Sequence, residues 1–210
     1  MAEHRQRLWL TFGVEGYLRW LGHLDLSRLW HRVLRRAALP LLYSRGFNPR
    51  PRMAIAFPLP VGFTAEGELL DLLLTHALPP LEVVQRLRSQ LPAGLTLHRV
   101  AEVDPGAPSL QSQLRAAEYR VRLKASAVDL PKRVQQLLAA ESCRRERRGR
   151  QYDLRPLIQH LSVEGCCELT MVLQAGDRGT GRPDEVLLAL RLDPRAAIIH
   201  RRKLHFAFDK

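Results

Sequence analysis

The residues best suited to chemistry in this chain lie in one segment between positions 43 and 52. The segment reads Tyr-Ser-Arg-Gly-Phe-Asn-Pro-Arg-Pro-Arg and combines cations, polar donors and aromatic rings. Guanidinium groups bind phosphate oxygens through paired hydrogen bonds, and an aromatic ring beside them can stack on a nucleobase. The prolines exclude a helix and stiffen the loop, so less entropy is lost when a ligand is held. The candidate binding residues are Tyr43, Ser44, Arg45, Phe47, Asn48, Arg50 and Arg52.

A row of arginines precedes this loop. Apolar residues recur at helical spacing from Leu26 to Ala37 and predict an amphipathic helix over residues 24–38. Its other side carries Arg28, Arg32, Arg35 and Arg36. The ordinary alternative for the helix is a solvated polar face. The alternative for the loop is a rigid connector that crosses a sheet face, with Tyr43 and Phe47 filling the core. Residues 19–52 hold eight arginines against one acid, a net charge of +7. That concentration favours an anion-binding surface shared by the helix and the loop.

A second basic segment spans residues 143–150 and reads Cys-Arg-Arg-Glu-Arg-Arg-Gly-Arg. Its five arginines and one glutamate give a net charge of +4. Such a run suits an exposed hairpin or arm that contacts a phosphate backbone, and a solvated loop is the alternative. The candidate nucleic-acid-binding residues here are Arg144, Arg145, Arg147, Arg148 and Arg150.

His23 and Asp25 stand at the predicted start of the helix, with Arg28 one turn on. A histidine beside a carboxylate can act as an acid–base pair. Groups at this position more often cap the helix and pair with a following arginine. We find no glycine-rich phosphate loop, zinc-protease motif or serine-hydrolase motif, and we therefore expect no catalytic residues.

Composition narrows the class of protein. The chain has 210 residues, 46% of them apolar, so a packed core is expected. Its 33 basic residues, 29 of them arginine, exceed the 21 acidic ones and give a net charge of +12, which favours an anionic partner. No apolar run is long enough to cross a membrane, and no signal-peptide core is present. Three cysteines without CxxC spacing indicate a reducing cytoplasmic location with no metal or cofactor.

The elements that would position these residues repeat one order twice. Strands are expected at 8–14, 53–57, 68–75 and 95–103, with helices at 24–38 and 81–91. After a linker at 104–108, strands at 119–125, 167–174 and 197–206 and helices at 130–140 and 184–190 follow, with a strand or hairpin edge within 143–157. The order β-α-β-β-α-β indicates an α+β protein of two tandem ferredoxin-like units with antiparallel sheets, residues 1–107 and 108–210. One continuous α+β domain with a larger mixed sheet is the alternative.

The first half also resembles a known bacterial family. The segments Leu21-Gly-His-Leu-Asp-Leu26, Tyr43-Ser-Arg-Gly-Phe-Asn-Pro-Arg-Pro51 and Pro58-Leu-Pro-Val-Gly62 closely resemble the radical-SAM-linked protein family. That family occurs alone or fused after a cobalamin-binding-type radical SAM protein. The resemblance is dense in the first half and thin in the second. Gly22 and Arg45 replace the serine and glutamine that the family usually has, which makes this loop more basic.

The resemblance implies a radical SAM protein as partner. It also implies an RNase E/G-type ribonuclease or the ribosome as candidate further partners. This chain lacks the CxxxCxxC cluster motif and is therefore not the radical enzyme. Our leading hypothesis is a non-catalytic RNA-binding accessory protein that works with a radical SAM enzyme in RNA or ribosome modification or processing. The alternatives are a protein-docking module for that enzyme without nucleic-acid binding, and an RNA-cleaving or RNA-modifying enzyme that uses His23, His31 or Tyr43.

Overall fold

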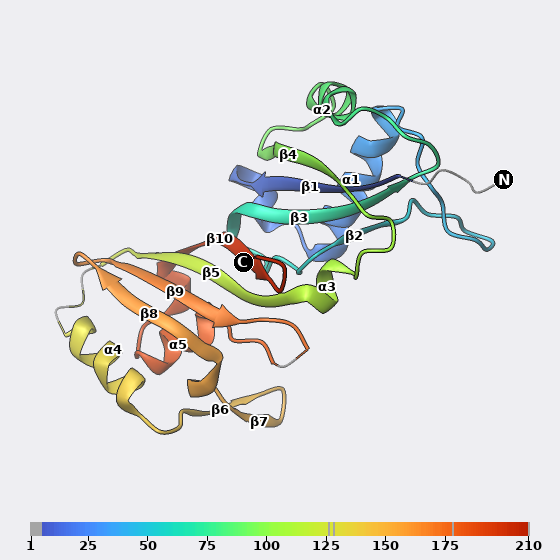
Figure 1. Ribbon diagram of the computed structural model, residues 1–210. Coiled ribbons are helices and arrows are strands. Elements are labelled where there is room, and N and C mark those ends of the chain that lie inside the picture. The colour runs from blue at the N-terminus through green and yellow to red at the C-terminus, as the bar shows by residue number, and fades with distance from the viewer. Residues whose placement is uncertain (1–5, 126, 128, 178, 210) are drawn as a thin grey trace. The chain divides into compact units, whose positions relative to one another are not determined.

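Strand β1 (Gln6–Val14) is part of the sheet in the amino-terminal half of the chain, and its successive side chains alternate between the two faces of that sheet. Leu8, Leu10 and Phe12 point to one face and are fully buried. The computed structural model describes residues 6–125, 127, 129–177 and 179–209. Within them the protein is a mixed α+β structure with five α-helices and mostly antiparallel sheet (Figure 1). Two compact units divide after Gln111, where the sequence suggested 107/108.

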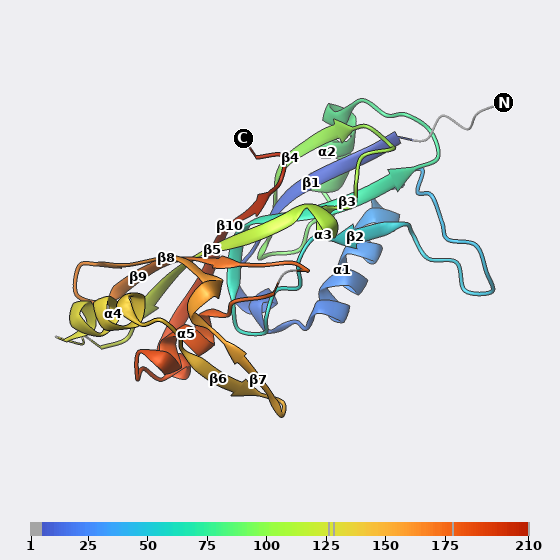
Figure 2. The same cartoon turned by 60° about the horizontal axis from the view of Figure 1, so that its bottom comes forward.

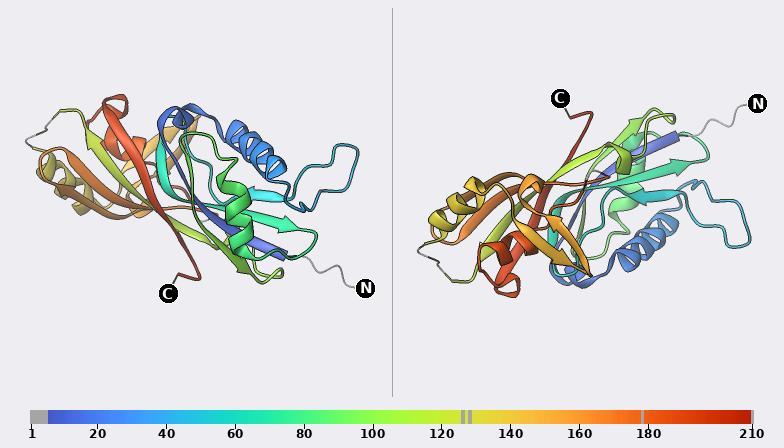
Figure 3. Two further views of the ribbon diagram at one scale, coloured as in Figure 1. Left: turned by 90° about the horizontal axis from the view of Figure 1, so that it is seen from above. Right: turned by 90° about the horizontal axis from the view of Figure 1, so that it is seen from below.

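Unit 1 contains two β-α-β segments. Its elements are β1, the short 3-10 helix η1 (Gly16–Trp20), α1 (His23–Arg36), β2 (Met53–Ile55), β3 (Thr64–Leu74), α2 (Pro80–Arg88) and β4 (Leu95–Val103). The strand order is β4-β1-β3-β2, and every neighbouring pair is antiparallel. Helices α1 and α2 cover one face of this sheet (Figure 3). Trp30 of α1 is fully buried there and meets Phe12 edge-on, with ring centroids 5.0 Å apart.

Unit 2 repeats the pattern with an inserted hairpin. It follows the short helix α3 (Leu110–Gln113) and comprises β5 (Leu114–Leu123), α4 (Leu130–Ala139), β6 (Arg144–Arg147), β7 (Arg150–Asp153), η2 (Arg155–Leu157), β8 (Ile158–Glu164), β9 (Glu168–Gln174), α5 (Pro183–Ala189), η3 (Pro194–Ala196) and β10 (Ala197–Phe206). Strands pair antiparallel in the order β10-β5-β9-β8, and β6 pairs only with β7.

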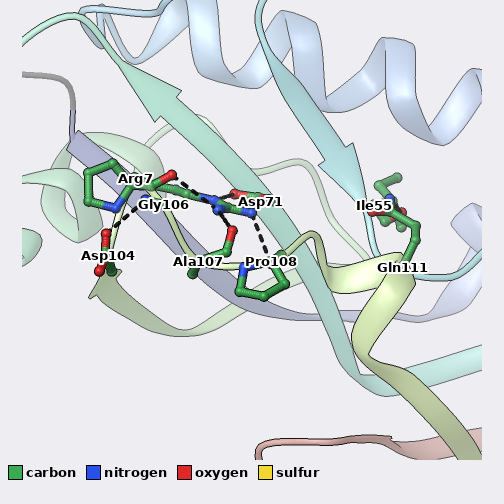
Figure 4. A network of polar contacts seen from close by, with 9 residues as sticks. Arg7, Ile55, Asp71, Asp104, Gly106, Ala107, Pro108 and Gln111 are labelled. Atoms are coloured by element: carbon green, nitrogen blue, oxygen red, sulfur yellow. Dashed lines mark hydrogen bonds and ion pairs between the residues drawn. The ribbon is translucent and has the colours of Figure 1, made fainter.

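The segment 104–108, expected to be a linker, is anchored to unit 1 (Figure 4). The Arg7 guanidinium donates to Asp71 of β3 over 2.9 and 2.5 Å. It also donates to the backbone carbonyls of Pro105, Ala107 and Pro108. Both charged side chains are at most 10% exposed. The segment therefore passes over the sheet as a fixed strap, because one buried arginine satisfies its carbonyl groups.

None of the helices in the described part of the chain is long and apolar enough to cross a membrane. Nor do the described residues bring together three or more His, Cys, Asp or Glu side chains in a group that could hold a metal ion.

Candidate functional site

The arginine row of α1 forms one exposed face. Leu26, Trp30, Val33 and Leu34 are buried, whereas all four predicted arginines are exposed. Of these four arginines, Arg28 forms an ion pair with another described residue, Asp25, over 3.0 Å. The guanidinium groups of Arg32, Arg35 and Arg36 have no ion-pair partner in the part of the chain that the structure describes. Since residues four and seven positions apart share a helix face, these cations form one strip.

The 43–52 loop protrudes as an irregular hairpin (Figure 2). Its base is closed by Ser44 N donating to Arg50 O over 2.8 Å and Arg50 N donating to Ser44 Oγ over 3.1 Å. Arg52 N donates to Leu42 O, and Leu42 N to Leu73 O of β3. These bonds fix both ends of the loop against the sheet. Its predicted arginines are exposed, and their side chains form no ion pair with other described residues.

Phe47 stands at the tip of this loop with its whole side chain in solvent. Its relative exposure is 105%, and Tyr43 at the base is 41% exposed. The alternative in which these two rings fill the core is therefore wrong for Phe47. Burying a phenylalanine ring is worth about 1.5–3 kcal/mol, so its full exposure between Arg45 and Asn48 leaves an apolar surface free for a ligand.

The charge of Arg50 in the 43–52 loop reaches His31 on α1. Burial lowers the pKa of His31 below its usual range, and the positive charges of Arg35 and Arg50 lower it further. Arg50 lies 19 residues after His31 in the sequence, yet its positive charge acts on the His31 imidazole. The structure therefore brings the base of the loop and the arginine strip into one electropositive surface. We call this surface, made by the exposed side of α1 and the 43–52 loop, the basic face.

The expected helix cap is not observed. The N-cap residue is Gly22, and no side chain accepts a capping hydrogen bond there. Asp25 instead pairs with Arg28, as their spacing allows. His23 Nδ1 is buried and finds no hydrogen-bond partner among the described residues. His23 and Asp25 thus form no hydrogen-bonded acid–base pair in the described structure.

The second basic segment forms the hairpin β6–β7. Arg144, Arg148 and Arg150 are exposed, and Arg147 is half-buried. Arg145 has a structural contact instead, because its Nε donates to the Glu185 carboxylate of α5 over 3.2 Å. The predicted site residues therefore fall on two separately described surfaces, one in each unit.

Several relevant residues escaped the sequence analysis. Arg7 and Asp71 gave no local signal because they are 64 positions apart. Tyr17, Trp20, Leu24 and Val61 are exposed apolar side chains around the start of α1, between 57% and 92% exposed. Arg19 stacks over the Trp20 ring with its guanidinium carbon 4.7 Å from the ring centroid.

Comparisons with known proteins identify the family to which this chain belongs. The model of a family described as "Uncharacterized protein conserved in bacteria (DUF2344)" matches residues 7–183. No curated protein matches the chain. A solved structure, "Crystal structure of putative glycine cleavage system transcriptional repressor", is 12% identical over 95% of this chain and 98% of that chain. Its TM-score of 0.25 is too low for the likeness to carry any conclusion.

Proposed function

The chain belongs to the DUF2344 family of conserved bacterial proteins, and we propose that it binds single-stranded RNA on the basic face of unit 1. One observation carries the proposal: a fully exposed phenylalanine stands among arginines that have no ion pair in the described structure. Proteins that bind single strands combine a basic surface for the phosphates with aromatic rings on which bases stack. The basic face supplies both features within unit 1.

The chemistry of each side chain on the basic face suggests which part of the RNA it would contact. Arg32, Arg35 and Arg36 would follow the phosphate backbone along the helix, and Arg50 and Arg52 would continue that path on the loop. Phe47, with Tyr43 at the base, would stack on bases that a duplex keeps hidden. Asn48 and Ser44 offer polar groups for base edges or the 2′-hydroxyl.

In this proposal the protein is a non-catalytic accessory to a radical SAM enzyme. The partnership rests on the resemblance of residues 21–62 to the radical-SAM-linked family. The two units would each be ferredoxin-like, which the strand orders β4-β1-β3-β2 and β10-β5-β9-β8 support. In an accessory role, this chain would bind the RNA and the radical SAM enzyme would carry out the reaction.

The test is binding of labelled oligouridylate by fluorescence anisotropy over a range of salt concentrations. The double variant Arg50→Ala/Arg52→Ala removes two cations of the basic face. Arg88→Ala/Arg99→Ala removes two exposed cations elsewhere in unit 1 and serves as the matched control. We expect the first variant to lose affinity and to reduce the slope of log K against log salt by about 1.4, since each single-strand phosphate contact contributes about 0.7. Equal behaviour of the two variants, or binding that salt does not weaken, would contradict the proposal.

A protein-docking function is the second candidate, and the exposed apolar residues at the start of α1 favour it. Tyr17, Trp20, Leu24 and Val61 expose rings and aliphatic groups that proteins usually bury. Aromatic residues with a nearby arginine are typical of interface hot spots. Nuclease-resistant copurification with the radical SAM enzyme that is lost in Leu24→Asp, while Arg50→Ala/Arg52→Ala retains it, would select docking over RNA binding.

A further inference from the structure

Unit 2 contains a basic pocket that involves part of the 143–150 segment together with residues distant in sequence. The pocket has a volume of about 690 Å³, within the range of small-ligand sites. Its lining residues are Arg147, Arg148, Arg150, Tyr152, Leu157, Gly179, Thr180 and Arg182. Among the described residues, four arginines and no carboxylate line this pocket.

The register of the β6–β7 hairpin explains this segregation of charge. Arg147 is paired with Arg150, and Arg145 with Tyr152. Alternation in a strand places these four side chains on the face toward the pocket and puts Glu146, opposite Gln151, on the other face. Two arginines directly opposite one another repel and cost stability. A bound anion between them would remove that repulsion.

The hairpin is held in place by a buried carboxylate. Glu185 of α5 is 8% exposed and accepts a hydrogen bond from Arg145 Nε over 3.2 Å. Burial and the Glu185 carboxylate, to which the hydroxyl is hydrogen-bonded, raise the pKa of Tyr152 to about 12. At the tip, Arg148 and Gly149 have φ of 49° and 74°, as a two-residue type I′ turn requires. The cationic wall is therefore preformed.

The opposite wall is equally constrained. Gly181 N donates to Gln174 O over 2.8 Å, and a Cβ at Gly181 would lie 3.1 Å from the Leu157 carbonyl oxygen. Gly179 has a φ of 119° and would bring a Cβ within 3.1 Å of Leu157. This close packing presents Thr180 and Arg182 beside the hairpin arginines.

We propose that this pocket binds a phosphomonoester, the group at the end of a nucleotide. Guanidinium forks match phosphate oxygens, and no ion pair engages the guanidinium groups of Arg147, Arg148, Arg150 and Arg182 within the described part of the chain. A monoester carries a charge of about −1.5 to −2 at neutral pH, which suits several cations better than the single charge of a diester. A concave site admits a chain end, whereas an internal phosphate has chain on both sides. Tyr152 and Leu157 supply apolar wall for the attached group.

The experiment is isothermal titration of the full chain with AMP, inorganic phosphate and adenosine. We expect AMP to bind at least ten times more tightly than adenosine, with inorganic phosphate between them. Arg147→Gln/Arg182→Gln should weaken AMP binding at least tenfold. Arg122→Gln/Arg195→Gln removes two exposed cations of unit 2 outside the pocket lining and should leave AMP binding unchanged. Far-UV circular dichroism checks that each variant folds.

Two further probes distinguish a phosphate at the end of an RNA chain from the phosphate of a free nucleotide. These probes are compared in the Arg50→Ala/Arg52→Ala variant, because the basic face would itself bind oligouridylate. A 5′-phosphorylated oligouridylate that binds more tightly than both AMP and its 5′-hydroxyl counterpart identifies an RNA end, and tighter binding of AMP identifies a free nucleotide; either result supports the pocket. Equal binding of AMP and adenosine, no saturable binding of any probe, or the same loss in Arg122→Gln/Arg195→Gln would overturn the proposal. Since none of these residues lies in unit 1, failure here leaves the basic face untouched.

Discussion

At the scale of single residues, arginines in this protein have two different roles. Arg7 is buried, forms an ion pair with Asp71 and donates to three backbone carbonyls, so its guanidinium group has a structural role within unit 1. Arg28 pairs with Asp25 in solvent, where the two side chains are 69% and 56% exposed. The energetic consequences of removing the acid therefore differ, because only the buried arginine would be left without water.

We predict that Asp71→Ala destabilises unit 1 by about 3–5 kcal/mol, the cost of an uncompensated buried charge. Asp25→Ala should change stability by less than about 1 kcal/mol. Trp9, Trp20 and Trp30 all lie in unit 1, so urea unfolding followed by tryptophan fluorescence reports on that unit. Similar midpoints for the two variants would show that the strap at 104–108 does not depend on the buried pair.

His31 provides a pH-dependent prediction for the basic face. Burial, Arg35 and Arg50 hold its pKa below the usual value of 6.5, so the free protein takes up its proton only at lower pH. A phosphate bound beside these arginines would offset their charge and raise the pKa of His31. By linkage, RNA affinity should then increase as pH falls from about 7 through the pKa of the complex. Titration of the His31 ring signal by NMR, with and without oligouridylate, measures the shift; His31→Gln should remove this pH dependence, and an unchanged pKa would exclude phosphate from this position.

At the scale of elements, periodicity located four of the five described α-helices but missed the four-residue α3 and several strand ends. Helix α1 ends two residues before the predicted limit, at Arg36, and β4 and β10 have their predicted bounds. Strand β8 was missed because a register shift between Ile158 and His160 breaks the two-residue period. Strand β5 begins at Leu114, five residues before the predicted start, where two alanines contribute little strand propensity. Bulges and weak propensity are set by pairing partners, which a single strand's sequence does not contain.

Glycine positions give the element-scale prediction. Gly94 begins the turn into β4 with a φ of 87°, and an added Cβ would lie 2.6 Å from the Glu15 carbonyl oxygen. Gly16 also has a positive φ, of 57°, but nothing lies within 4 Å of its Cβ position. Gly16→Ala should therefore cost about 1–2 kcal/mol for conformation alone, and Gly94→Ala about 2–5 kcal/mol because overpacking is added. Urea midpoints by tryptophan fluorescence test the difference; equal costs would mean that β4 shifts to relieve the contact.

At the scale of the whole molecule, the excess of +12 is concentrated on two surfaces. Residue type and spacing were sufficient to propose the basic face, since its residues are close in sequence. The pocket could not be predicted, because Arg182, which lies 32 residues after Arg150 in the sequence, meets the hairpin arginines only after folding. Charge patterning thus predicted two candidate anion-binding surfaces but not the shape of the anion that each would accept.

Substitutions on one of the two surfaces should therefore leave ligand binding at the other surface unchanged. Arg50→Ala/Arg52→Ala should weaken oligouridylate binding and leave AMP binding within about twofold, because unit 2 keeps its own lining residues. Arg147→Gln/Arg182→Gln should do the reverse with an oligouridylate that has a 5′-hydroxyl, which offers no monoester. Net charge falls by two in both variants, so a nonspecific effect of total charge would lower both affinities together. Anisotropy for the oligonucleotide and calorimetry for AMP on both variants distinguish two local sites from one diffuse field, and parallel losses would show that the arginine surplus acts only as a global charge.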